Sequence, residues 1–148
     1  WNSKVETLAR MDFGHADLIL AVPKVWIDVD TLDDLDAAAA QFRARHGHRL
    51  RIATKYHRQG REFLQDNGVA DYQLVDSQGA TEGTVLNHTA EMIADITSTG
   101  ETLRANHLKV LSDGMIHASQ ATLFRSRTAK WTKSQKTDLD DLRLRLGV

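Results

Sequence analysis

The sequence predicts an α/β fold built on a largely parallel sheet. Two observations lead to this prediction. Short apolar runs typical of buried strands alternate, through the middle of the chain, with segments whose apolar residues recur at helical spacing. The 148 residues are 41% hydrophobic, enough for the core of one ordinary domain. In sheets of this class ligands bind beyond the carboxyl ends of the strands, so the loops at those ends are the candidates for a site.

The first elements are a strand and a helix. Residues 16–22 (ADLILAV) form an apolar run that ends at Pro23 and reads as a buried strand. Apolar residues then recur at helical spacing after Thr31, which forms a capping box with Asp34. Gly47 is expected to end this helix.

The middle of the chain continues the alternation. Strands are expected over residues 50–54, 72–75 and 92–97, each a short run rich in apolar residues. Helices are expected over residues 60–66 and from Thr81-Glu82 onward. Parallel strands joined by helices are the usual product of this order.

In the last third of the chain the alternation of strands and helices is expected to give way to two consecutive strands. A helix over residues 99–106 is followed by two strands, over 108–111 and 115–124. The sequence Ser112-Asp113-Gly114 between them has the chemistry of a hairpin turn. An amphipathic helix is expected over residues 133–146.

Composition excludes several classes of protein. With 19 basic and 20 acidic residues the formal net charge is -1, which favours neither a nucleic-acid partner nor an anionic membrane. The absence of cysteine excludes a disulfide scaffold and a thiolate metal site and fits a cytoplasmic protein. The longest apolar run, Leu18 to Pro23, is far too short to cross a bilayer, and no signal peptide is visible. Because the chain opens on Trp1, it is expected to be a piece of a longer protein.

The most informative segment is the strand over residues 92–97 and the loop after it. The strand carries one acid, Asp95, and the loop with its glycine leads into the start of the helix expected over residues 99–106. Backbone amides, hydroxyls and a helix start are the groups that bind a phosphate ester. An alternative is that Ser98 and Glu101 form a capping box and serve only to start the helix. The hydroxyl-rich loop itself consists of Thr97, Ser98, Thr99 and Gly100.

Two other strand ends carry candidate residues. Lys55 can neutralise a phosphate or simply be solvated. Glu82, between Gly79 and Gly83, can accept hydrogen bonds from ribose hydroxyls or favour the start of a helix. No motif for a covalent nucleophile, a Walker A loop, a dinucleotide fold or a histidine metal site occurs, so we expect no covalent catalytic group and no metal held directly by the protein.

Taken together, the motifs resemble the catalytic subunit of ATP phosphoribosyltransferase in its short form. The likeness covers about residues 8–128, and Asp-Ile-Thr-Ser-Thr-Gly-x-Thr-Leu is its most specific part. The chain departs from the family pattern at His107, where the family usually has glycine. The segments that carry the resemblance are DFGHAD (12–17), AVP (21–23), RIATKY (51–56), GATEG (79–83), DITSTGETL (95–103), ANHLKVL (105–111) and SQA (119–121).

The resemblance implies a two-lobed fold like that of periplasmic binding proteins. Residues 24–111 would form the complete inner lobe with the phosphoribosyl pyrophosphate loop. Residues 1–23 and 112–148 would form part of the outer lobe, whose first half is missing, together with the C-terminal helix. The chain would cross between lobes at residues 16–22 and 121–125, and composition makes residues 24–30 a candidate hinge.

The implied reaction joins N1 of ATP to C1 of phosphoribosyl pyrophosphate with release of pyrophosphate, the first step of histidine biosynthesis. The resemblance implies that the loop Thr97, Ser98, Thr99, Gly100, Glu101 and Thr102 holds the 5-phosphate, and that Asp95 orients the ribose or the loop. Glu82 would lie near the ribose hydroxyls or the metal shell, and Lys55 is a weaker phosphate contact.

The family also implies partners. Mg²⁺ would come with the substrate pyrophosphate, and a regulatory subunit resembling histidyl-tRNA synthetase would complete a hetero-oligomer. Because the chain stops at Val148, soon after its last helix, the short form is favoured, and residues 1–148 alone are expected to be inactive. The alternative is a non-enzymatic solute-binding module of the same architecture, which would not require the hydroxyl-rich loop.

Overall fold

A computed structural model describes residues 3–77 and 79–148 of the chain. The described chain forms two compact units, each treated by itself below. The larger unit is Ala16–Ser119, and the smaller one combines residues up to His15 with Gln120–Val148. Both units contain strands and helices, so the predicted α/β class is confirmed.

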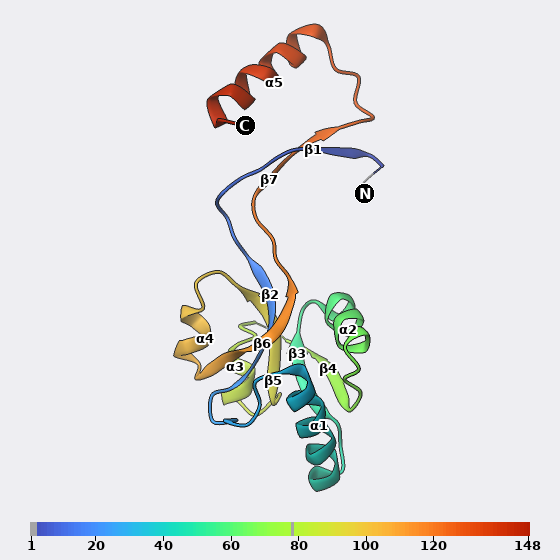
Figure 1. Ribbon diagram of the computed structural model, residues 1–148, viewed down its shortest axis with the longest axis vertical. Coiled ribbons are helices and arrows are strands. Elements are labelled where there is room, and N and C mark those ends of the chain that lie inside the picture. Colours follow the sequence, from blue (N-terminus) through green and yellow to red (C-terminus); the bar gives the residue numbers. More distant parts are fainter. Residues whose placement is uncertain (1–2, 78) are drawn as a thin grey trace. The chain divides into compact units, whose positions relative to one another are not determined.

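A mixed sheet forms the centre of the larger unit (Figure 1). Its strand order within the described residues is β4-β3-β5-β2-β6. Strands β4, β3 and β5 are parallel, as predicted, whereas β2 is antiparallel to both β5 and β6. The bounds are β2 (Asp17–Pro23), β3 (Leu50–Thr54), β4 (Tyr72–Asp76), β5 (Met92–Thr97) and β6 (Leu108–His117).

Helices cover both faces of this sheet (Figure 1). On one face α1 (Leu32–His46) and α2 (His57–Asp66) bury Leu35 and Leu64 against the sheet. On the other face α4 (Glu101–Ala105) buries Leu103, and α3 (Gly83–Leu86) packs through Val85. Successive side chains of β5 therefore pack alternately into two apolar cores, one on each face of the sheet.

The first helix has the termini that the sequence predicts. The Thr31 hydroxyl accepts from the Asp34 amide at 3.2 Å, and the Asp34 carboxylate accepts from the Thr31 amide at 2.9 Å. Hydrogen bonds from the backbone amide of Asp30 and from Thr31 hold the pKa of Asp34 below its ordinary value. Gly47 ends the helix with φ of 74°, a conformation that glycine adopts without steric cost.

The predicted hairpin around residues 112–114 is wrong, because β6 runs as one strand from Leu108 to His117, and its pairing with β2 only shifts register between Val110 and Met115. Ser112 instead donates its amide to the carbonyl of Asp30 at 2.8 Å. Gly114 has a packing role. A Cβ at this position would lie 2.8 Å from Leu111 Cβ in the same strand and 3.2 Å from Leu20 Cβ in β2, so this packing requires glycine.

The smaller unit contains a two-stranded ribbon and a helix. Strand β1 (Val5–Arg10), which the sequence did not reveal, pairs antiparallel with β7 (Thr122–Ser126). Helix α5 (Lys133–Leu146) matches the predicted range. None of the described residues of α5 is buried.

The two units divide at different points from the predicted lobes. The sequence interpretation placed residues 1–23 and 112–148 in one lobe, but the larger unit begins at Ala16 and ends at Ser119. Strands β2 and β6 pair with each other along most of their length, which keeps both in the same sheet. Residues 24–30, interpreted as a hinge, also lie within this unit, where Val29 is buried.

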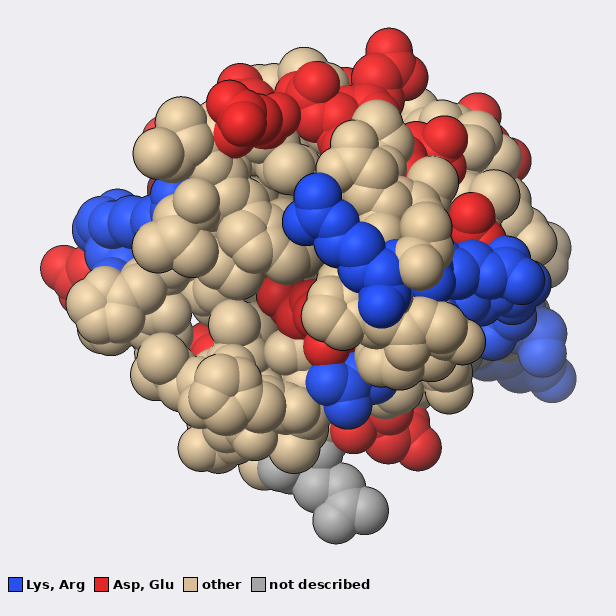
Figure 2. Space-filling model, turned by 90° about the horizontal axis from the view of Figure 1, so that it is seen from below, with Lys and Arg blue, Asp and Glu red and all other residues tan. Residues whose placement is uncertain are grey.

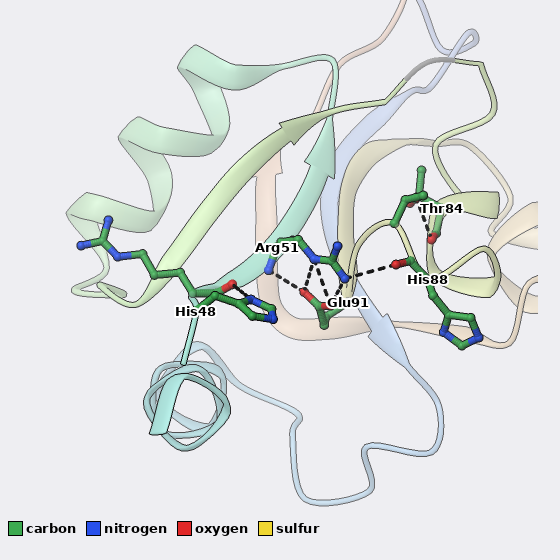
Figure 3. A network of polar contacts seen from close by, with 7 residues as sticks. His48, Arg51, Thr84, His88 and Glu91 are labelled. Atoms are coloured by element: carbon green, nitrogen blue, oxygen red, sulfur yellow. Dashed lines mark hydrogen bonds and ion pairs between the residues drawn. The ribbon is translucent and has the colours of Figure 1, made fainter. Parts of the chain in front are cut away.

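An ion pair joins the beginning of β3 to the residue that precedes β5 (Figure 3). The Glu91 carboxylate accepts from Arg51 Nη2 at 2.6 Å and from the Arg51 amide at 2.7 Å. Arg51 Nη2 also donates to the carbonyl of His88 at 3.2 Å. Burial raises the pKa of Glu91, but the hydrogen bonds from Arg51 outweigh it and bring the pKa below its ordinary value. The pair clamps two neighbouring parallel strands at their amino ends.

Candidate functional site

The loops that follow β3, β4 and β5 leave the same edge of the sheet, because these three strands are parallel and adjacent. In β5, Asp95 and Thr97 follow the buried Ile93 at a spacing of two residues. Side chains at this spacing point to one face of a sheet, here the face that α3 and α4 cover. The side chains of Asp95 and Thr97 therefore lie at the carboxyl end of β5, on the face that α3 and α4 cover.

A hollow of about 170 Å³ lies at this end of β5. It unites the loop with Asp95 from β5 and Glu82 from the segment before α3. Except for Lys55, every candidate residue that the sequence singled out lines it. The lining residues are Glu82, Asp95, Ile96, Thr97, Ser98, Thr99, Gly100, Glu101, Thr102 and Leu103.

The loop is shaped by its own hydroxyls. Gly100 has φ of 75°, a left-handed conformation that favours glycine, and its amide donates to Thr97 Oγ1 at 3.1 Å. The Glu101 amide donates to Thr99 Oγ1 at 3.4 Å. From the last turn of α4, Arg104 Nη1 donates to the Thr99 carbonyl at 3.2 Å.

The alternative interpretation of this loop as a capping box does not describe the structure. Gly100, not Ser98, is the N-cap of α4, and it makes no side-chain cap bond. The helix begins at Glu101, two residues later than a Ser98 cap requires, because the left-handed turn at Gly100 is interposed. Since α4 has only 5 residues, the donors available to a ligand are local amides and hydroxyls and not a long helix dipole.

The two acids of the hollow are held by neighbouring backbone. Asp95 Oδ1 accepts from the Ile96 amide at 2.8 Å, and its other oxygen accepts no hydrogen bond from the residues that the structure describes. Glu82 follows Thr81, whose side chain is buried and hydrogen-bonded to Ser77 Oγ at 2.8 Å. This buried hydroxyl pair directly precedes Glu82, which lines the hollow.

Lys55 is not brought to the hollow. It follows β3 as an exposed residue and is absent from the hollow's lining. At the same edge, His57 Nε2 lies 2.5 Å from Asp76 Oδ1, an exposed contact that ties α2 to the end of β4. Sequence reasoning missed Arg104. Its position four residues after Gly100, one helical turn away, is the signal that could have found it.

The arrangement suits a ligand that carries both a phosphate and hydroxyl groups. Hydroxyls and amides of the loop can donate to phosphate oxygens, while Glu82 and Asp95 can accept from sugar hydroxyls. Within residues 3–77 and 79–148 no group of three or more potential ligands is arranged to hold a metal ion. A cation at this hollow would therefore need most of its ligands from the substrate or water.

Elsewhere the surface carries charges of both signs. One face of the molecule shows Lys and Arg in a band across its centre, with Asp and Glu gathered along one margin (Figure 2). Further acidic residues lie beside the basic ones on this face, in keeping with the formal net charge of -1. In the part of the chain that the structure describes, no helix has the length and apolar character needed to cross a membrane.

Comparison with known proteins identifies the family of the chain and supports its fold. The HisG family model, described as ATP phosphoribosyltransferase, matches residues 1–147. The ATP phosphoribosyltransferase of Cereibacter sphaeroides is 74% identical over 134 residues, which are 90% of this chain and 57% of that protein. That of Mesorhizobium japonicum is 53% identical over 93% of this chain and 60% of that protein. The chain thus spans a little over half the length of these relatives.

Among solved structures, the ATP phosphoribosyl transferase (HisG:HisZ) complex from Thermotoga maritima matches 97% of this chain and 60% of that chain, with a TM-score of 0.64 and 18% identity. The probable amino-acid transporter extracellular-binding protein ytmK from Bacillus subtilis matches 98% of this chain and 58% of its own, with a TM-score of 0.57 and 11% identity. These likenesses confirm the predicted relation to the periplasmic-binding-protein fold. The family match and the identity to curated relatives go further: the chain belongs to the ATP phosphoribosyltransferase family.

Proposed function

We propose that the protein containing this chain transfers the phosphoribosyl group of phosphoribosyl pyrophosphate to N1 of ATP and releases pyrophosphate, the first step of histidine biosynthesis. The observation that carries the proposal is the hollow at the end of β5, where the loop from Thr97 to Thr102 meets the carboxylates of Asp95 and Glu82. Family membership supplies the reaction, and the hollow supplies a place for its phosphorylated sugar.

The chemistry needs positioning more than it needs a covalent group. The lone pair of adenine N1 forms a bond to C1 of the ribose while the bond from C1 to the pyrophosphate oxygen breaks, and the leaving pyrophosphate takes that electron pair. Holding the 5-phosphate in the loop fixes C1 relative to the incoming base, and such orientation lowers a barrier without a covalent intermediate. Asp95 and Glu82 accept from ribose hydroxyls and favour the positive charge that develops on the sugar ring.

Mg²⁺ is proposed to enter with the substrate pyrophosphate. The donor chemistry of the hollow fits this arrangement, because its carboxylates are hard oxygen ligands of the kind that Mg²⁺ and its bound waters prefer. Glu82 and Asp95 would contact that hydrated ion. The ion would supply neutralisation of the charge that builds on the leaving pyrophosphate.

The rest of the assembly is also part of the proposal. The larger unit is proposed to be the inner lobe and the smaller unit a part of the outer lobe. A regulatory subunit resembling histidyl-tRNA synthetase is proposed to complete a hetero-oligomer, in line with the HisG:HisZ complex of Thermotoga maritima. Since ATP and phosphoribosyl pyrophosphate are substrates made inside the cell, the proposed compartment is the cytoplasm. Residues 1–148 alone are proposed to be inactive.

A test measures binding of phosphoribosyl pyrophosphate with Mg²⁺ to the full-length protein by isothermal titration. Thr99→Ala and Gly100→Ala are expected to weaken binding, because one removes a hydroxyl of the loop and the other opposes its left-handed turn. Thr137→Ala, on the exposed helix α5, is the matched control and should bind as the parent does. Unchanged affinity in both loop variants would refute the assignment of the loop. A protein that binds an amino acid but not the sugar phosphate would favour the solute-binding alternative.

A further inference from the structure

We infer that Arg104 locks the peptide unit between Thr99 and Gly100 in the orientation that a phosphate requires, and so sets the affinity of the loop for its substrate. The hold on this peptide unit, which we call the lock, involves only residues of the loop and Arg104. Its consequence for the substrate rests on the proposed function. Arg104 acts through the loop, so it is a positioning residue.

The peptide unit is held at both of its ends. Arg104 Nη1 donates to the Thr99 carbonyl at 3.2 Å, while the amide of Gly100, in the same peptide plane, donates to Thr97 Oγ1 at 3.1 Å. In a trans peptide these two groups point in opposite directions, so the two bonds fix one orientation of the plane. Within the described chain no carboxylate pairs with Arg104, which leaves its guanidinium available for this contact.

Arg104 contacts the loop without lining the hollow. Thr97, Thr99 and Gly100 line the hollow, but Arg104 is not part of its lining. A Cβ built on Gly100 would lie 3.1 Å from Arg104 Nη1, so the guanidinium packs directly against the glycine. The contact is therefore steric as well as polar.

The lock is needed because Gly100 would otherwise let this peptide unit rotate. Gly100 has φ of 75°, and because it lacks a Cβ it can take negative φ values as easily. A rotation of the peptide plane would then exchange the positions of the Thr99 carbonyl and the Gly100 amide at little steric cost. The contacts of Arg104 and Thr97 favour one of the two orientations.

The orientation matters because the hollow already holds several negative groups. Glu82, Asp95 and Glu101 line it, so a phosphate can bind only where donors face it. With the plane locked, Thr97 Oγ1 accepts from Gly100, and its own proton remains free to donate to a ligand. With the plane reversed, a carbonyl dipole would join the carboxylates and repel the phosphate.

The experiment uses the full-length protein with its regulatory partner and three variants. Arg104→Met removes the donors and keeps an unbranched side chain, Arg104→Lys retains one donor, and Arg45→Met is a matched control on the exposed part of α1. Steady-state kinetics give KM and kcat for phosphoribosyl pyrophosphate. Hydrogen exchange of the Gly100 amide reports the peptide plane without reference to any substrate.

Arg104→Met is expected to raise KM for phosphoribosyl pyrophosphate about tenfold, the loss of one charge-assisted hydrogen bond, with kcat and the melting temperature nearly unchanged. Exchange of the Gly100 amide should accelerate in the same variant. Arg104→Lys should restore most of the affinity, and Arg45→Met should match the parent in every measurement.

Unchanged KM and unchanged Gly100 exchange in Arg104→Met would overturn the inference. Equal losses in Arg104→Met and Arg45→Met would also overturn it, because they would show a general effect of removing a surface charge. If the unsubstituted protein transfers no phosphoribosyl group, the proposed function fails. Exchange of the Gly100 amide then decides alone whether the lock exists.

Discussion

Removing the Glu91 carboxylate tests how much the ion pair with Arg51 contributes to stability. Glu91 is 14% exposed and accepts bonds of 2.6 and 2.7 Å, and the paired Arg51 side chain is 33% exposed. A buried charge-assisted hydrogen bond contributes about 1.5–3 kcal/mol, and partial exposure of Arg51 reduces that figure through solvent screening. Glu91→Ala is therefore expected to lower the free energy of unfolding by about 2 kcal/mol, because it also leaves the Arg51 amide without its acceptor.

The assay is urea denaturation of the full-length protein near neutral pH, followed by circular dichroism. Glu62→Ala is the control, since Glu62 is exposed and its contact with Arg58 is 3.9 Å long. The control should change the unfolding free energy by less than about 0.5 kcal/mol. A Glu91→Ala protein as stable as the control would refute the reasoning that this clamp holds β3 to β5.

The pH dependence of the same pair has a definite sign. The folded protein holds the pKa of Glu91 below the ordinary value of 4.5. A carboxylate of this kind stabilises the fold fully above its unfolded pKa, and the stabilisation is lost as the pH falls through the lower folded pKa. Glu91→Gln should therefore lose stability less steeply than the parent below pH 4.5, in denaturation measured at a series of acidic pH values.

Three further substitutions test the packing and backbone described above. Gly114→Ala should destabilise the protein by about 1–3 kcal/mol, measured by thermal unfolding, because the new Cβ would lie 2.8 Å from Leu111 Cβ. No loss would show that the Leu111 and Leu20 side chains can shift to accommodate the added methyl group. His107→Gly should stabilise by about 1 kcal/mol in the same assay, since His107 has φ of 57°. A destabilised variant would mean that the imidazole makes contacts worth more than the backbone strain. Leu103→Ala should cost about 2–4 kcal/mol, because Leu103 is 5% exposed and anchors α4; a smaller loss would indicate that the loop does not depend on this helix.

The strand and the hydroxyl-rich loop after it could be predicted because their signals are local. A strand, an acid, consecutive hydroxyls and a glycine lie within a few residues, and each has a defined backbone preference. The structure brings all of them to one hollow. The same holds for α1, whose capping box and terminal glycine are adjacent to the helix that they bound.

The errors arose where distant contacts decide the structure. Ser112-Asp113-Gly114 has turn chemistry, but bonds to Asp30 and Leu32, about 80 residues away, keep it in a strand. The pairing of β1 with β7 joins the two ends of the chain and has no local signature. Arg104 was missed for a related reason, since its role depends on the fold of its side chain back over the loop.

The ends of the larger unit meet. The Ala16 amide donates to the carbonyl of Ser119 at 3.0 Å, and the Ser119 hydroxyl donates to the Ala16 carbonyl. A module whose entry and exit points touch can be excised, grafted into an exposed turn of another scaffold or circularly permuted with little distortion. Residues 16–119 are therefore a segment that could be transplanted together with the hydroxyl-rich loop and its hollow.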